Sequence, residues 1–137
     1  MHIVALEVHE SARADLRILA VQDKKAAARI LALLEEIRAD ANFLDLLLAN
    51  GRGKHRVADF EFNVKSWREA TKHVSGELWR LRVFGRETTG YRIVYGYHWQ
   101  TKQLCVLAVA PKEQVNYDNV DTGLAERVVS DWRRLVS

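Results

Sequence analysis

Residues 78–110 decide the fold of this chain, and they read LWRLRVFGRETTGYRIVYGYHWQTKQLCVLAVA. Apolar and polar side chains alternate over 78–84 and again over 91–99, which is typical of strands that bury one face. The stretch 103–110 is apolar almost throughout, as expected for a central strand buried on both sides. Three strands in series with short links predict an antiparallel meander.

Upstream of these strands the apolar residues recur with a period of 3.6, which predicts helices. Ser11 is a candidate N-cap for a helix over about 12–21. Asp23 is a candidate N-cap for a second helix that ends near Ala39. Since only two or three residues connect the two helices, we expect an antiparallel helical hairpin.

Shorter elements complete the order. We expect a strand over 3–9, a short helix over 43–49 capped by Asn42, a strand over 59–64, and a last helix over 123–136 capped by Asp121 or Thr122. The predicted fold class is α+β. An N-terminal helical hairpin packs on one face of an antiparallel β-meander sheet, a C-terminal helix follows, and residues 1–137 form a single domain of one sheet and one helical layer.

Composition limits the function classes. The chain has 137 residues and one cysteine, Cys105, which excludes an intramolecular disulfide and a cysteine-rich zinc finger and fits the reducing cytoplasm. No apolar run approaches the ~20 residues that span a bilayer, so we expect no membrane partner. The five histidines are scattered, and no Rossmann or P-loop context is found. We therefore expect neither a metal nor a cofactor.

The charges are distributed unevenly. The net charge is only +3, yet residues 65–92 contain seven lysines and arginines against three glutamates. A protein with one basic face is a candidate for binding a polyanion such as RNA. A solvated and otherwise inert strand surface would give the same composition.

Within this basic stretch, Arg80 and Arg82 point to the same side of one predicted strand, and Arg92 points to the matching side of the next. Arginine presents a planar set of donors that fits phosphate oxygens. Lys112 and Tyr117 follow the last strand and are placed at the rim of the same surface. The pattern predicts a phosphodiester-binding face.

A structural interpretation stands beside this one. Arg80 and Arg82 would then form salt bridges with Asp59 and Glu61 on the neighbouring strand and have no further role. His98 lies about six residues from Arg92, or ~20 Å along a strand, so we expect it to be exposed and non-catalytic.

Several stretches resemble the RelE/ParE toxin superfamily. They are Leu78-Trp-Arg-Leu-Arg, Gly90-Tyr-Arg-Ile-Val-Tyr, Leu104-Cys-Val-Leu-Ala-Val-Ala and Val115-Asn-Tyr. Residues 69–79 are similar to the YoeB branch, and the tail after Ala110 is similar to YafO-type toxins. The order of helices and strands also agrees with that superfamily.

The resemblance implies the toxin of a type II toxin–antitoxin system. Such a RelE-like toxin is a ribosome-dependent messenger-RNA endonuclease that needs no metal. In it the 2′-hydroxyl of the RNA attacks the adjacent phosphate. The implied partners are a cognate antitoxin protein, the ribosome and mRNA.

The resemblance also implies roles for individual residues. Arg82, Arg92, Lys112 and Tyr117 would be catalytic, and Arg80, Lys72 and Arg86 would bind RNA. Glu69 would be a candidate general base. Two alternatives stay open: a ParE-like inhibitor of DNA gyrase without enzymatic activity, and a non-toxic domain of the same fold that binds RNA or a protein.

Overall fold

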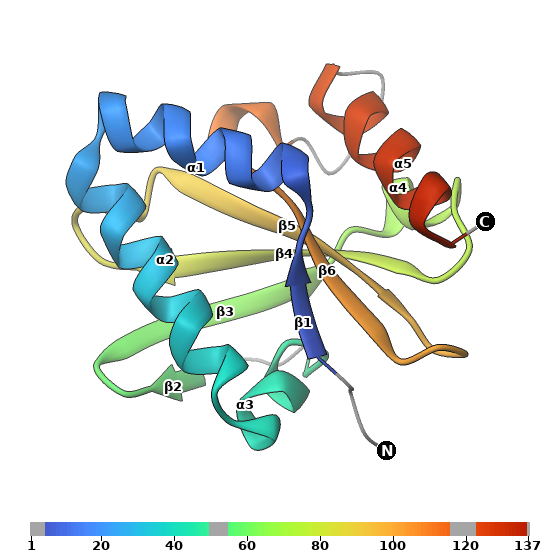
Figure 1. The fold of residues 1–137 in the computed structure, drawn as a ribbon, viewed down its shortest axis with the longest axis horizontal. Coiled ribbons are helices and arrows are strands. Elements are labelled where there is room, and N and C mark those ends of the chain that lie inside the picture. The colour runs from blue at the N-terminus through green and yellow to red at the C-terminus, as the bar shows by residue number, and fades with distance from the viewer. Residues whose placement is uncertain (1–4, 50–54, 116–122, 137) are drawn as a thin grey trace.

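The computed structural model describes residues 5–49, 55–115 and 123–136, which form one six-stranded sheet flanked by helices (Figure 1). The strands are β1 (Ala5–Val8), β2 (His55–Val57), β3 (Phe60–Ser66), β4 (Glu77–Phe84), β5 (Tyr91–His98) and β6 (Gln103–Pro111). Their order across the sheet is β1-β6-β5-β4-β3-β2. Strands β2 to β6 are antiparallel neighbours, and β1 joins β6 in parallel. The predicted α+β class and meander are confirmed.

Helices lie on both faces of the sheet. They are α1 (Glu10–Gln22), α2 (Lys24–Arg38), α3 (Ala41–Leu46), α4 (Arg68–Thr71) and α5 (Gly123–Val136), with a 3₁₀ turn η1 (Lys112–Gln114) after β6. As predicted, α1 and α2 form a hairpin across one face (Figure 1). The expectation of a single helical layer is wrong, because α4 and α5 pack on the opposite face. No helix among the described residues is long and apolar enough to cross a membrane.

The hairpin and the sheet enclose the larger of two apolar cores. From the sheet it takes Trp79, Leu81 and Val83 of β4 together with Ile93 and Tyr95 of β5, all at most 6% exposed. From the helices this core takes the stripe Ala26, Ala27, Ile30, Leu33, Leu34 and Ile37 of α2. The predicted alternation is confirmed for β4, whereas β5 is buried on both faces from Ile93 to His98 because Val94 belongs to the second core.

The second core lies between α5 and the other face of the sheet. Leu124, Val128 and Trp132 of α5 are buried there beside Trp67, which precedes α4. Strand β6 contributes side chains to both cores, because it lies between β1 and β5 with helices on either side. This confirms its expected burial on both faces and explains its nearly continuous apolar sequence.

Two helix N-caps differ from expectation. His9, not Ser11, caps α1, because the Nδ1 of His9 accepts a hydrogen bond from the backbone N–H of Ser11 at 3.0 Å. Asp23 caps α2 as predicted, accepting from Ala26 N at 3.2 Å. Asp40, not Asn42, caps α3 by accepting from Asn42 N. The proposed caps Asp121 and Thr122 of the last helix lie outside the described residues.

Two short elements, strand β2 and helix α4, were not predicted from the sequence. The expected strand over 59–64 is β3 at Phe60–Ser66, and it pairs with β2 through a turn at Ala58 and Asp59. Ala58 has a φ of 53°, which a non-glycine residue adopts mainly in tight turns. Helix α4 has four residues, too few for a 3.6-residue period to be visible.

Gly96 fixes the position of α5. A Cβ atom at Gly96 would lie 2.6 Å from Cε3 of Trp132, and Trp132 is itself held by a 2.7 Å hydrogen bond from Nε1 to the carbonyl of Ser75. We expect Gly96→Ala to lower the free energy of unfolding by about 1–3 kcal/mol through overpacking. Urea denaturation measures it. Gly90→Ala is the control, since its Cβ would meet nothing within 4 Å. Equal stability of both variants would contradict the packing.

Candidate basic catalytic face

Strand β4 projects two arginines from the face opposite the helical hairpin. Trp79, Leu81 and Val83 point into the first core, so Arg80 and Arg82 between them point to the other side. Across the ladder, Arg80 pairs with Lys65 of β3, and Arg82 pairs with Asn63. The basic side chains thus lie on the part of this face that is formed by β3 and β4.

Strand β5 adds a third arginine to the same surface. Arg80 pairs with Val94, and the ladder ends at the pair Leu81–Ile93, so Arg92 lies across from Arg82 at the next position. Arg80, Arg82 and Arg92 are each half-buried. We call these three residues the arginine cluster, and they stand where the sequence predicted them.

Neutral groups orient the three guanidinium ions. Arg80 donates from Nη1 to Oδ1 of Asn63. Thr89, in the β4–β5 hairpin, joins the other two: Arg82 Nη2 reaches its Oγ1 at 3.4 Å, and Arg92 Nη1 donates to its carbonyl oxygen at 2.9 Å. These contacts fix the planes of the guanidinium groups, as a preorganised anion-binding surface requires.

Asn63 and Thr89 were not identified from the sequence. Asn63 was detectable in part, because it alternates with Phe62 and Val64 and so had to share a face with the polar side of β3. Nothing in the sequence indicated Thr89, because its position depends on the shape of a six-residue hairpin, 85–90. Phe84 was also unexpected. The Cζ atom of Arg82 lies 4.9 Å from the centroid of the Phe84 ring, and this cation–π contact stabilises the guanidinium charge.

The candidate base Glu69 lies at one end of this surface. Helix α4 is anchored at Leu78, whose N–H donates to Oγ1 of Thr71 at 2.9 Å. Glu69 on this helix accepts a hydrogen bond from Lys72 Nζ at 2.8 Å. Leu78 is four residues from Arg82, about 13 Å along β4. Glu69 and Lys72 therefore form a pair with each other, nearer to Arg80 than to Arg92.

The remaining predicted residues lie toward the β4–β5 hairpin. Arg86 is exposed in the hairpin itself. The backbone N–H of Lys112 donates to the carbonyl of Gly90 at 2.8 Å. Lys112 therefore follows β6 two residues after Ala110, which pairs with Arg92, and its side chain is exposed. Tyr117 lies outside the described residues. The structure thus groups Arg80, Arg82 and Arg92, and it places Lys112 and Arg86 at their hairpin end.

The acidic residues of the neighbouring strand have partners on other elements. Asp59 lies 3.4 Å from Nη1 of Arg29 on α2. Glu61 lies 3.7 Å from Nη2 of Arg56 on β2. The expected exposure of His98 is wrong: it is 5% exposed, because the segment before β4 covers the end of β5 and Ser75 approaches its ring.

Burial leaves the other nucleophiles inactive. Desolvation raises the pKa of the Cys105 thiol to about 12, so the group is a neutral thiol at physiological pH, as its apolar strand predicted. Burial likewise raises the pKa of Tyr95 well above its usual range, and its hydroxyl donates to the carbonyl of Leu47. Among the described residues, no three histidine, cysteine or carboxylate side chains gather as metal ligands would.

Comparisons with known proteins add one similarity of fold. No family model matches the chain, and no curated protein matches it. A solved structure, the archaeal RelE–RelB complex from Pyrococcus horikoshii OT3, aligns with a TM-score of 0.46 and 16% sequence identity, over 82% of this chain and 99% of that chain. At these values the similarity assigns neither a family nor an activity.

Proposed function

We propose that this protein is the toxin of a type II toxin–antitoxin system and acts as a metal-independent endonuclease on mRNA at the ribosome. One observation supports the proposal most: Arg80, Arg82 and Arg92 stand together on one sheet face, and hydrogen bonds orient their guanidinium groups. A strand surface with a merely solvating role does not need fixed guanidinium planes.

The proposed reaction breaks one phosphodiester bond. The 2′-hydroxyl oxygen of the RNA attacks the adjacent phosphorus and loses its proton to a base of the RNA or the ribosome, because Glu69 pairs with Lys72 nearer to Arg80 than to Arg92. The bond from phosphorus to the 5′-oxygen breaks, and that oxygen takes up a proton. The products carry a 2′,3′-cyclic phosphate and a 5′-hydroxyl.

The arginine cluster acts on the charge of this transition state. Arg82 and Arg92, which both contact Thr89, would bind the phosphoryl oxygens as negative charge accumulates on them. Arg80, Lys72 and Arg86 would bind neighbouring phosphates, and Lys112 would complete the site at its hairpin end. Tyr117 keeps the catalytic role that the resemblance implies. Positioning by the ribosome then supplies the in-line geometry.

A toxin of this kind needs a partner that restrains it in the cytoplasm. The exposed cations around the arginine cluster favour an acidic antitoxin segment that orders on binding. Copurification with the product of the neighbouring gene at low and high salt tests this. A protein that is harmless alone and captures no acidic partner would favour a non-toxic RNA-binding domain.

Induced expression in bacteria tests the proposed reaction. We expect growth arrest and new mRNA 5′ ends within coding regions, with a hydroxyl at each new end. Adaptor ligation before and after treatment with polynucleotide kinase distinguishes the chemistries, because only kinase-treated ends should be captured. Efficient capture without kinase would indicate 5′-phosphates and contradict attack by the 2′-hydroxyl. Inhibited DNA gyrase with intact mRNA would favour the ParE-like alternative.

A further inference from the structure

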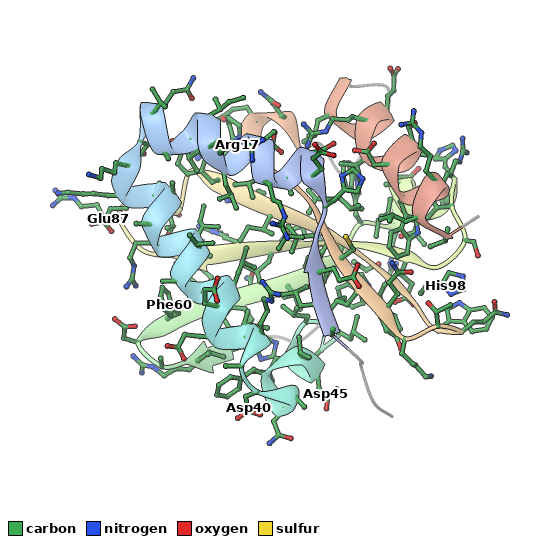
Figure 2. All side chains as sticks on the ribbon, in the orientation of Figure 1. Arg17, Asp40, Asp45, Phe60, Glu87 and His98 are labelled. Carbon is green, nitrogen blue, oxygen red and sulfur yellow. The ribbon has the colours of Figure 1, made fainter. Side chains whose placement is uncertain are left out.

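Trp99, in the turn between β5 and β6, is the one tryptophan with a large exposed surface. It is 53% exposed, whereas Trp67, Trp79 and Trp132 are at most 6% exposed. Its indole stacks on the ring of His98 with 5.8 Å between centroids and 15° between planes. This turn is remote from the β4–β5 hairpin: Glu87 and His98 appear at opposite ends of the molecule (Figure 2).

The ring of His98, on which Trp99 stacks, is held in place by contacts with neighbouring residues. His98 is 5% exposed, and its Nε2 lies 3.2 Å from Oγ of Ser75. The carbonyl of Ser75 accepts the 2.7 Å hydrogen bond from Trp132, which belongs to α5 and is fully buried. An exposed indole is thereby held on a fixed support, which reduces the side-chain entropy that the protein loses when a ligand stacks on it.

A basic groove lies along the same edge. It has a volume of about 440 Å³ and is lined by His73, Arg133 and Arg134, with Glu126 as its acidic residue. The guanidinium of Arg133 donates from Nε and Nη2 to the carbonyl of His73, at 3.0 and 2.7 Å, which fixes its plane. His73 is two residues from Ser75, and Ser75 contacts the His98 ring on which Trp99 stacks, so the 73–75 segment connects the groove to the stack.

We propose that this surface, which we call the Trp99 edge (His73, Ser75, His98, Trp99, Arg133 and Arg134), binds an unpaired strand of RNA. A basic groove that follows the phosphates, combined with an aromatic ring on which a base stacks, is the arrangement that single-stranded nucleic acid requires. An acidic peptide would use the arginines but would gain little from a flat, supported indole. The choice of RNA over DNA rests on the proposed function.

The Trp99 edge is separate from the arginine cluster. His98 lies six residues from Arg92 along β5, about 20 Å. RNA held at this edge is therefore a second contact that positions the protein on its target, not part of the reacting site.

Tryptophan fluorescence tests the inference directly. Titration of the purified full-length protein with oligouridylate or oligoadenylate, without ribosomes, is expected to quench emission, because only Trp99 is accessible to a stacking base. Fluorescence anisotropy of labelled RNA then gives affinities. Trp99→Ala should weaken binding by about tenfold, the order of one lost base stack, and Trp99→Phe should retain most of the affinity but lose the quenching.

Matched variants separate stacking from charge. Arg133→Ala combined with Arg134→Ala should weaken binding at low salt and reduce the slope of log affinity against log salt by about one to two. Val21→Ala, which alters an 87% exposed apolar residue on α1, should change nothing. Melting temperatures well above the assay temperature should show that each of these variants is folded.

Two results would overturn the inference. The first is an RNA affinity that is unchanged in Trp99→Ala. The second is displacement of RNA by polyglutamate whose own binding depends equally on Trp99, since this would indicate a protein partner.

Failure of the proposed function gives a different pattern. Arg92→Ala should keep the fluorescence titration even where mRNA cleavage is lost. A protein that binds RNA at Trp99 but cleaves none would retain this inference and lose the other.

Discussion

Arg92→Ala is expected to abolish growth arrest and to slow mRNA cleavage on the ribosome by about 10²- to 10³-fold, the effect of removing one preorganised charge from a transition-state site. Arg92 lies across from Arg82, and its guanidinium is held by the carbonyls of Thr89 and Tyr91 at 2.9 Å. Cleavage is measured by mapping mRNA 5′ ends after induction, and by single-turnover cleavage on programmed ribosomes.

The control variant removes a similar charge elsewhere on the sheet. Arg56 on β2 forms a 3.7 Å ion pair with Glu61, and its side chain is 67% exposed. Arg56→Ala should therefore leave cleavage unchanged. Arg92→Lys should recover part of the activity, because lysine keeps the charge but loses the planar set of donors. Full toxicity of a well-expressed Arg92→Ala protein would show that the arginine cluster is not the reacting site.

The sheet and the arginine cluster were predictable because both follow from period-two alternation. Once Trp79, Leu81 and Val83 face the hairpin, Arg80 and Arg82 must share the opposite face. The same reasoning places Arg92 opposite Ile93. Side-chain direction on a strand is thus a local property, and local properties can be derived from sequence.

Features that depend on tertiary contacts were not predictable. Helix α4 and strand β2 are too short to show a period, so packing and pairing define them. His98 was judged by its sequence distance from Arg92, but its burial depends on Ser75, which is 23 residues away. The arginines of α5 also have different surroundings: Arg127 forms a bidentate pair with Asp15 of α1, at 3.0 and 2.7 Å, whereas Arg133 lines the groove.

The Asp15–Arg127 pair also shows why α5 forms part of the domain rather than an appendage. Asp15 accepts a hydrogen bond from the backbone N–H of Val109 on β6, so one carboxylate joins α1, β6 and α5. The hydrogen bond from Arg127 to Asp15 raises the pKa of the guanidinium, which keeps the charge in place. Helix α5 thus docks on the sheet as a structural element.

Ile93→Asp is expected to prevent folding. Ile93 is 1% exposed, and its ladder partners Leu81 and Val109 are buried on the same face. Loss of a buried isoleucine side chain costs about 2–5 kcal/mol, and an unpaired polar group in its place adds several more. The sum is comparable with the whole stability of a small domain, about 5–15 kcal/mol. Far-UV circular dichroism and urea denaturation of the purified chain measure the effect.

Arg92→Asp is the matched control, since it places the same carboxylate one residue earlier on the half-buried opposite face. That variant should lose cleavage but fold, with a cooperative urea transition. Ile93→Val, which keeps an apolar side chain, should cost only about 0.5–1.5 kcal/mol. If Ile93→Asp unfolded at the same urea concentration as the wild type, β5 would not pack Ile93 against the helical hairpin. The direction assigned to Arg92, and with it the arginine cluster, would then be wrong as well, because the two side chains alternate on one strand.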